Sequence, residues 1–338
     1  MSSESIKMVH MKTYAWPIVA TLALALCIVP SLAGAASLLL VLNKGDRTLA
    51  IVDGDTLRVK GHVPAGPDPH EVIASADGRT AYISNYTQGN GAPNTLTPVD
   101  LVGMKALPPI DLGALSRPHG LTLGGGKVYF TAERSKMIGS YDPALGKVDW
   151  VMGTGQNLTH MVIVSKDRRR IFTTNLGSAT VCILEQAGAD WNLTTIPVGR
   201  RAEGFDLSPD ESELWVANAQ DASISIIDPG SRKVVKTLSV PFQNANRLKF
   251  TPDGKYALVS DPGGKDLFVL DVASRTLVKT IDVGGNAAGI QMEPNGARAF
   301  VAVGAANSVA VIDLKDLKII RRLATGPAPD GLAWAELK

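Results

Sequence analysis

The sequence is poor in the residues that most catalytic and cofactor motifs require. Two cysteines and five histidines occur among 338 residues, and aromatic side chains make up 5%. No CxxCH segment, nucleophile elbow or glycine-rich phosphate loop is present. These absences argue against cytochromes, serine hydrolases and nucleotide-binding proteins.

The chain also lacks a strong charge of either sign. It carries 34 basic and 32 acidic residues, for a formal net charge of +2, and no basic run interleaved with aromatics. Its one basic cluster, residues 168–170, falls in a predicted turn, and we interpret it as a solvated hairpin tip. We therefore expect no nucleic-acid partner.

A long apolar run occurs near the N-terminus, over roughly residues 17–32. Lys7 and Lys12 precede it, and the small residues at 33–35 suit cleavage before Ala36. The pattern predicts a signal peptide over residues 1–35, hence a periplasmic or secreted protein that is free of the membrane after cleavage. A retained anchor is the alternative, disfavoured because the run is short and contains two prolines.

Cleavage at this position would remove Cys27 and leave Cys182 as the remaining cysteine. An intramolecular disulfide is then impossible. Because Cys182 stands between Val181 and Ile183, we predict that it is a small buried core residue.

What the sequence does contain is a repeat of about 42 residues. Seven units align on the residue that opens each one. These residues are His70, His119, His160, Glu203, Asn246, Ala288 and Asp330. A repeat of this length is one supersecondary unit that must stack on its neighbours to bury its apolar faces.

Each unit alternates short apolar strands with turn residues. In the fourth unit the strands are predicted at 204–207, 214–218, 223–228 and 234–238. In the fifth, Asp253 and Gly254 after a proline suit a tight hairpin turn. Four strands at this period are typical of a β-propeller blade.

The two ends of the chain each hold part of a blade. Residues 38–42, 48–53 and 57–63 supply three strands without a first one, and residues 331–334 supply a first strand alone. We therefore predict an all-β, seven-bladed propeller with four antiparallel strands per blade, one domain over residues 37–338. Pairing of the N- and C-terminal strands closes the ring.

Three segments carry a family resemblance: residues 81–85 (AYISN), 214–218 (LWVAN) and 310–313 (AVID). With their neighbours they resemble the YVTN-type β-propeller repeat of exported bacterial proteins. The resemblance covers nearly all of the chain after the predicted signal. It implies the propeller fold and a distant similarity to propeller lactonases and streptogramin lyases, but no single activity.

The opening residues of the units form the candidate site. In a propeller the first strand of each blade lines the central channel, so these residues should gather at one mouth. His70, His119, His160 and Glu203 come from four consecutive units, and imidazole and carboxylate groups are good ligands for Zn, Cu or Fe. We predict that the three histidines bind one metal ion, with Glu203 as the fourth ligand or as a base beside the metal; the alternative is that all four only solvate the channel.

Other polar residues should share that face. Asn246 and Asp330 could orient a ligand imidazole or only solvate the channel. Arg117 and Arg201, just before their first strands, could hold an anionic substrate or remain solvated rim charges. His62 lies outside the register and is expected at the surface.

The loops between second and third strands should reach the same mouth. The first of these, residues 85–94, is long enough to cover it, and its counterpart in the next unit contains Glu133, Arg134 and Ser135. Functional residues favour such loops on a rigid scaffold.

Two classes of function remain open. One is a monomeric binding protein that takes a small molecule or a protein at the channel face, with a metal at the mouth. The other is a metal-dependent envelope enzyme, lactonase-like, lyase-like or an oxidoreductase, that uses the same site.

Overall fold

The computed structural model describes residues 36–86 and 93–338, with residues 1, 8 and 10–13. The predicted signal segment and most of the long loop at 85–94 lie outside the described residues. Within the described part of the chain, no helix is long and apolar enough to cross a membrane. The one helical element in these ranges is a 3-10 turn, η1 (Gly304–Ala306).

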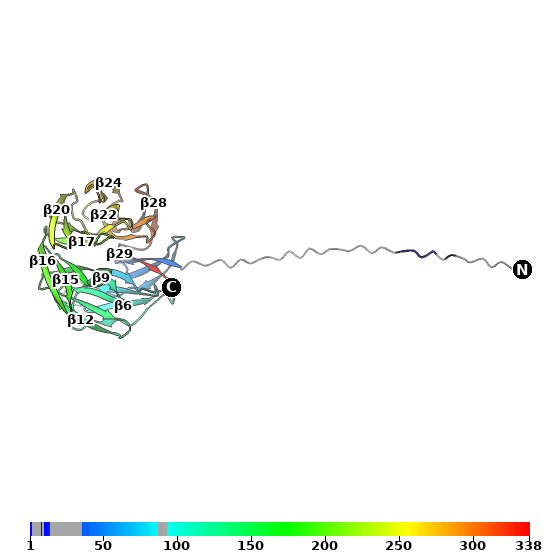
Figure 1. Cartoon of the computed structure of the whole chain (residues 1–338), viewed down its shortest axis with the longest axis horizontal. Coiled ribbons are helices and arrows are strands. Elements are labelled where there is room, and N and C mark those ends of the chain that lie inside the picture. Colours follow the sequence, from blue (N-terminus) through cyan, green and yellow to red (C-terminus); the bar gives the residue numbers. More distant parts are fainter. Residues whose placement is uncertain (2–7, 9, 14–35, 87–92) are drawn as a thin grey trace. The chain divides into compact units, whose positions relative to one another are not determined.

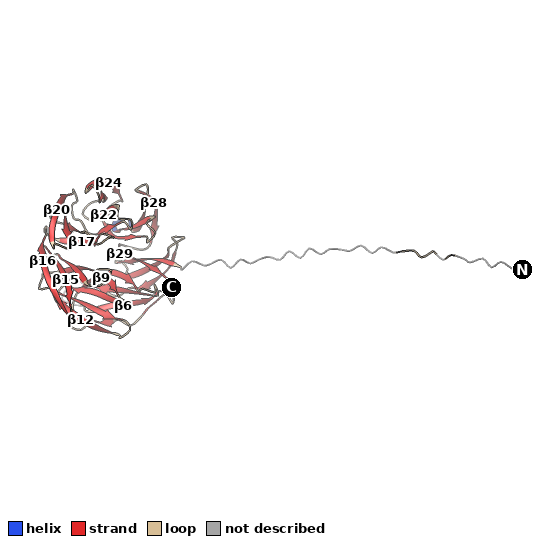
Figure 2. Cartoon of the chain, in the orientation of Figure 1, coloured by secondary structure: helices blue, strands red, loops and turns tan. Residues whose placement is uncertain are grey.

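Residues 36–338 form seven antiparallel sheets, as the repeat predicts (Figures 1 and 2). The first two sheets in chain order hold β1 (Ser37–Asn43), β2 (Thr48–Asp53) and β3 (Val59–Pro64), then β4 (Pro69–Ala74), β5 (Thr80–Asn85), β6 (Thr95–Asp100), β7 (Lys105–Ala106) and β8 (Ile110–Asp111). The next two hold β9 (Pro118–Gly124), β10 (Lys127–Ala132), β11 (Met137–Asp142) and β12 (Lys147–Gly153), then β13 (Thr159–Val164), β14 (Arg170–Asn175), β15 (Thr180–Ala187) and β16 (Asp190–Pro197).

The remaining strands continue the same order. The fifth sheet holds β17 (Ala202–Leu207), β18 (Leu214–Asn218), β19 (Ser223–Asp228) and β20 (Lys233–Ser239). The sixth holds β21 (Leu248–Phe250), β22 (Tyr256–Ser260), β23 (Asp266–Asp271) and β24 (Thr276–Asp282), and the seventh β25 (Ala287–Met292), β26 (Arg298–Val303), β27 (Ser308–Asp313) and β28 (Lys318–Ala324). One blade departs from four strands, because β7 and β8 both pair with β6.

The last strand, β29 (Pro329–Glu336), closes the ring. It pairs antiparallel with β1, so one sheet has the order β29-β1-β2-β3. Each innermost strand also contacts the next, from β29 through β4, β9, β13, β17, β21 and β25 back to β29. The predicted seven-bladed propeller and its closure are confirmed.

The apolar core lies between the blades. Seven clusters of buried hydrophobic residues occur in the described residues, and each spans two neighbouring sheets. Both faces of each sheet are covered, which explains the runs of buried residues in strands such as β1 and β19. Cys182 lies fully buried in one of these clusters as a free thiol, as predicted.

An irregularity at the start of the innermost strands positions the opening residues. In β4 the register shifts between Pro69 and Val72, and corresponding shifts occur in β13, β17 and β25. A β-bulge leaves its residues out of the ladder and re-aims their side chains. The opening residue of the unit, His70 in β4, lies within the bulge and is free to face the channel mouth.

In three blades a side-chain hydroxyl group ties the start of the innermost strand to the next blade, through Thr131, Thr174 and Ser260. Thr131 Oγ1 accepts a hydrogen bond from the Gly120 N–H at 2.9 Å and donates to the His160 carbonyl at 2.7 Å. Thr174 Oγ1 makes the same link, accepting from Met161 and donating to the Glu203 carbonyl. The opening residues of successive blades are therefore held relative to one another by buried hydrogen bonds.

Candidate metal centre

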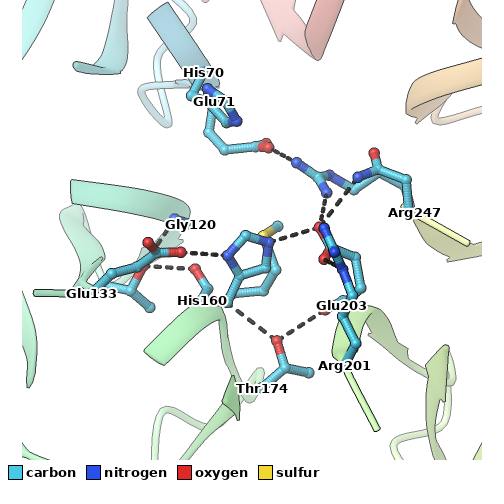
Figure 3. A network of polar contacts seen from close by, with 12 residues as sticks. His70, Glu71, Gly120, Glu133, His160, Thr174, Arg201, Glu203 and Arg247 are labelled. Carbon is cyan, nitrogen blue, oxygen red and sulfur yellow. Dashed lines mark hydrogen bonds and ion pairs between the residues drawn. The ribbon is translucent and has the colours of Figure 1, made fainter. Parts of the chain in front are cut away.

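The four predicted ligands line one cavity of about 420 Å³ at a channel mouth. His119, His160 and Glu203 are buried, and His70 is partly exposed. Figure 3 shows His160 at the centre, with Glu133 and Glu203 on either side. The register thus brings all four side chains to one place, as expected for first-strand residues.

The group that converges most closely differs from the predicted set. His119, Glu133 and His160 each offer one ligand atom, and these three atoms lie within 4.8 Å of one another. Glu133 comes directly after β10, in the loop expected to face the mouth, but it was not among the predicted ligands. His119 and His160 belong to both sets, whereas His70 and Glu203 lie outside this closest group.

His160 is clamped between two carboxylates. Its Nδ1 lies 2.6 Å from Glu133 Oε1 and its Nε2 lies 2.8 Å from Glu203 Oε1. Both ring nitrogens donate when the imidazole is protonated. In the absence of a metal, this geometry therefore suits the imidazolium form.

His160 and Glu203 each shift the pKa of the other toward the charged form. Burial by itself lowers the pKa of His160, but the charge of Glu203 and the hydrogen bonds that the ring donates to both carboxylates outweigh it and raise that pKa to about 9. For Glu203, burial favours the neutral acid, yet His160 and Arg247 lower its pKa to about 2. His160 and Glu203 are thus an ion pair at neutral pH.

His119 is the neutral imidazole of the cluster. It is 1% exposed, and its ring stacks on His160 at 3.9 Å between centroids. Burial, with the charge of His160, holds its pKa well below the usual range. Its Nδ1 is buried without a hydrogen-bond partner among the described residues, so this lone pair or proton is unsatisfied.

His70 lies beside His119 at 4.7 Å between ring centroids. Its Nδ1 is 2.7 Å from Lys44 Nζ, and burial and this ammonium group hold its pKa well below the usual range. Lys44 also lies 3.4 Å from Asp330. Lys44 therefore bridges Asp330 and His70.

Glu203 is held in place by the two residues that open the next blade. Asn246 Nδ2 donates to Glu203 Oε1 at 3.2 Å, so Asn246 contacts a carboxylate of the cluster and not an imidazole. Arg247, 6% exposed, lies 3.6 Å from the same oxygen and forms an ion pair with Glu71 across the channel. Sequence analysis missed Arg247, which follows the register position by one residue.

Glu133 has its own supporting contacts. The Tyr86 hydroxyl donates to Glu133 Oε2 at 2.7 Å and accepts from Arg117 Nη2 at 2.6 Å. Burial and the Glu133 charge raise the pKa of Tyr86, so it remains a neutral donor. Arg117 lines the cavity, and its Nε lies 3.5 Å from Glu133 Oε2.

Glu133 and Tyr86 share a position in the repeat. Each directly follows the second strand of its blade, and its N–H donates to the carbonyl of the residue two places before the unit's opening residue. Leu176 and Ala219 occupy the same position in other blades. An alignment of the units at this second position would have identified Glu133. His62, by contrast, is exposed on β3, as expected.

Comparison with known proteins bears on the fold. The structure is similar to a functionally unknown protein from Desulfotomaculum acetoxidans, with 16% identity, a TM-score of 0.73, and coverage of 89% of this chain and 99% of the other. It is also similar to the periplasmic gluconolactonase of Pseudomonas aeruginosa, with 17% identity, a TM-score of 0.72, and coverage of 90% and 100%. Hydrazine synthase from Kuenenia stuttgartiensis gives 18% identity, a TM-score of 0.68, and coverage of 80% and 90%.

At these levels of identity the similarity shows a shared fold and does not indicate a shared activity. Among curated proteins, none matches the sequence. A family profile does match, over residues 123–298, which is just over half of the chain. The chain belongs to the YNCE-like β-propeller family.

Proposed function

We propose that this protein is an exported β-propeller that binds one divalent transition metal at the channel mouth, through His119, Glu133 and His160. The observation that carries the proposal is the convergence of three buried ligand atoms within 4.8 Å. Two imidazoles and a carboxylate suit Zn, Cu or Fe, and three protein ligands leave a coordination position open.

The contacts around the cluster support this assignment. With a metal on Nδ1, His160 would keep its Nε2–H bonded to Glu203, as metal-bound histidines commonly do with a carboxylate. The buried, unpartnered Nδ1 of His119 would gain the partner it lacks. In this arrangement Glu203 orients His160, and His70 is the adjacent imidazole available as a further ligand.

Elemental analysis of the purified mature protein tests the proposal. After reconstitution with Zn(II), Cu(II) or Fe(II), we expect one ion per chain in the wild type. The His119→Ala variant should lose the ion but keep a cooperative melting transition, because the blades are held by apolar clusters that do not include His119. His62→Ala, an exposed histidine on an outer strand, is the matched control and should keep its metal. A wild type that holds no metal under any of these conditions would refute the proposal.

Catalysis at the same centre is the second candidate. It is favoured by the cavity of about 420 Å³ that the three ligands line, since an open site beside a metal can admit water and a substrate. The metal-loaded wild type should then open the ring of at least one lactone in a panel, by hydrolysis or by elimination. The His119→Ala variant should not. Stoichiometric metal without any turnover would favour a binding protein.

Export is part of the proposal and has its own test. The N-terminal pattern supports cleavage before Ala36, in the periplasm or outside the cell. Mass spectrometry of the mature protein should give a chain that begins near Ala36. A membrane-bound product that retains residues 11–35 would show that this segment is an anchor.

A further inference from the structure

Two arginines occupy equivalent positions on either side of the metal centre. Arg117 precedes His119 by two residues, and Arg201 precedes Glu203 by two. Both line the cavity. The blade between them has Leu158 at this position.

The fold does not require arginine here. The position adopts a positive φ, 62° at Arg117 and 59° at Arg201, but also 52° at Leu158 and 50° at Ala328. In all four blades its carbonyl accepts a hydrogen bond from the residue after the second strand. Because the backbone alone makes that contact, the two guanidinium groups are free for another role.

Both guanidinium groups have donors to spare. Arg117 Nε is buried without a hydrogen-bond partner and lies 3.5 Å from Glu133 Oε2. Arg201 Nε lies 3.7 Å from Glu203 Oε2, and its side chain is 50% exposed. Since a guanidinium carries five N–H donors in a planar fork, several remain for a ligand in the cavity.

The charge of the cavity changes when a metal is bound. Among the residues that line it, Arg117, Arg201, Arg247 and the His160 imidazolium carry four positive charges, against three negative charges on Glu133, Glu203 and Asp330. Beyond the lining, Lys44 adds one positive charge and its partner Asp68, with Glu71 at Arg247, adds two negative charges, so the metal-free cluster is neutral. A divalent ion on neutral imidazoles then leaves an excess of positive charge, which an anion would neutralise.

We propose that the ligand of this site is a small carboxylate, bound by Arg117 and Arg201 beside the metal. This proposal rests on the proposed metal function. Guanidinium matches carboxylate in a planar, two-bonded geometry. A dianionic phosphate fits less well, because Glu133 and Glu203 already lie beside the two arginines. The cavity volume suits a small molecule.

Calorimetric titration of the zinc-loaded mature protein tests this proposal. Acetate, lactate, gluconate and citrate are the carboxylate probes, lactamide is the neutral analogue of lactate, and glycerol 3-phosphate is the phosphate probe. At least one carboxylate should bind, and lactamide should not. Arg117→Gln and Arg201→Gln should each weaken carboxylate binding at least tenfold.

Arg200→Gln is the matched control. Arg200 is the neighbour of Arg201, but it is 66% exposed and hydrogen-bonds Asp221 at 2.6 Å, outside the cavity. Its substitution should change affinity less than twofold. Because Arg201 is half exposed, Arg201→Gln should fold, and near-UV circular dichroism checks this for each variant.

Metal content, measured on every sample, separates this inference from the function on which it rests. If the wild type holds one ion but binds no carboxylate, binds lactamide equally, or prefers the phosphate, the carboxylate proposal is wrong and the metal centre stands. Equal weakening by Arg200→Gln and Arg201→Gln overturns it as well. If the wild type holds no ion, the metal function itself has failed.

Discussion

At the scale of single residues, His160 connects the two halves of the site. Its ring contacts Glu133 on one side and Glu203 on the other (Figure 3). Tyr86 and Arg117 support Glu133, and Asn246 and Arg247 support Glu203. Without metal, an imidazolium and two carboxylates hold the cluster together. With metal, the same nitrogen that contacts Glu133 would become a ligand.

This charge state makes the stability of the metal-free protein depend on pH. The pKa of His160 is about 9 in the folded chain, against about 6.5 when unfolded. A raised folded-state pKa contributes stability that is full below pH 6.5 and is lost as the pH rises through 9. We expect the free energy of unfolding to fall by up to about 3 kcal/mol across this window.

Denaturant unfolding in the presence of a chelator, at several pH values, measures this change. His160→Gln removes the titrating group and should flatten the profile between pH 6.5 and 9. Identical profiles for the wild type and the variant would show that His160 is not charged in the folded protein.

A second prediction at this scale separates a metal ligand from a residue that orients one. If Glu203 only positions His160, Glu203→Gln should retain one ion per chain with affinity 10- to 100-fold lower, the usual cost of losing an outer carboxylate. Competition with a chromophoric chelator measures this affinity. Glu185→Gln, at an exposed ion pair with Arg232, is the control. Loss of stoichiometric metal in Glu203→Gln would instead make Glu203 a ligand.

The sequence predicts part of this site and not the rest for a physical reason. His119 and His160 occupy one register and stand out because histidine is rare in the chain. Glu133 and Arg247 belong to other positions of the repeat, whose residue types change from unit to unit: the adjacent units carry Tyr86 and Leu176 at the first position, and glycine at the second. Their roles depend on contacts across the channel, such as the one between Arg247 and Glu71, which no spacing within a unit encodes.

At the scale of elements, strands were predictable because their apolar alternation is strong and their turns carry Asp, Gly and Pro. The first and last residues of the strands were less predictable. The outer strand predicted from Leu57 begins at Val59, because Leu57 adopts a φ of 57° in the preceding turn. The bulges that aim the opening residues at the channel have no sequence signal beyond the glycine that often follows.

That glycine makes a testable contact. A Cβ at Gly204 would lie 2.1 Å from the Asn246 carbonyl oxygen, in the backbone of the next blade. Since a backbone atom cannot move aside cheaply, Gly204→Ala should destabilise the protein by about 1–3 kcal/mol. Gly153→Ala, where nothing lies within 4 Å, should be close to neutral. Equal midpoints in denaturant for the two variants would show that the blades can separate at this point.

At the scale of the whole molecule, the geometry of the proposed metal centre depends on ring closure. Its residues come from separate blades, and each blade is held only by its two neighbours through the apolar clusters between them. The one place where no continuous chain joins the strands of a blade is the pairing of β29 with β1. Closure there keeps every other interface in register, including those that carry His119, Glu133 and His160.

Removal of residues 331–338 should therefore destabilise the whole propeller. It deletes most of β29, exposes β1 and takes Ala333 and Ala335 out of the cluster shared with β4 and β5. We expect a melting midpoint lower by more than 10 °C, or loss of the cooperative transition, together with loss of stoichiometric metal. Deletion of Lys338 alone, which leaves β29 intact, is the control. A truncated chain that kept a sharp, wild-type-like melt would show that the ring holds without this strand, and the metal centre would then have to be stabilised within its own blades.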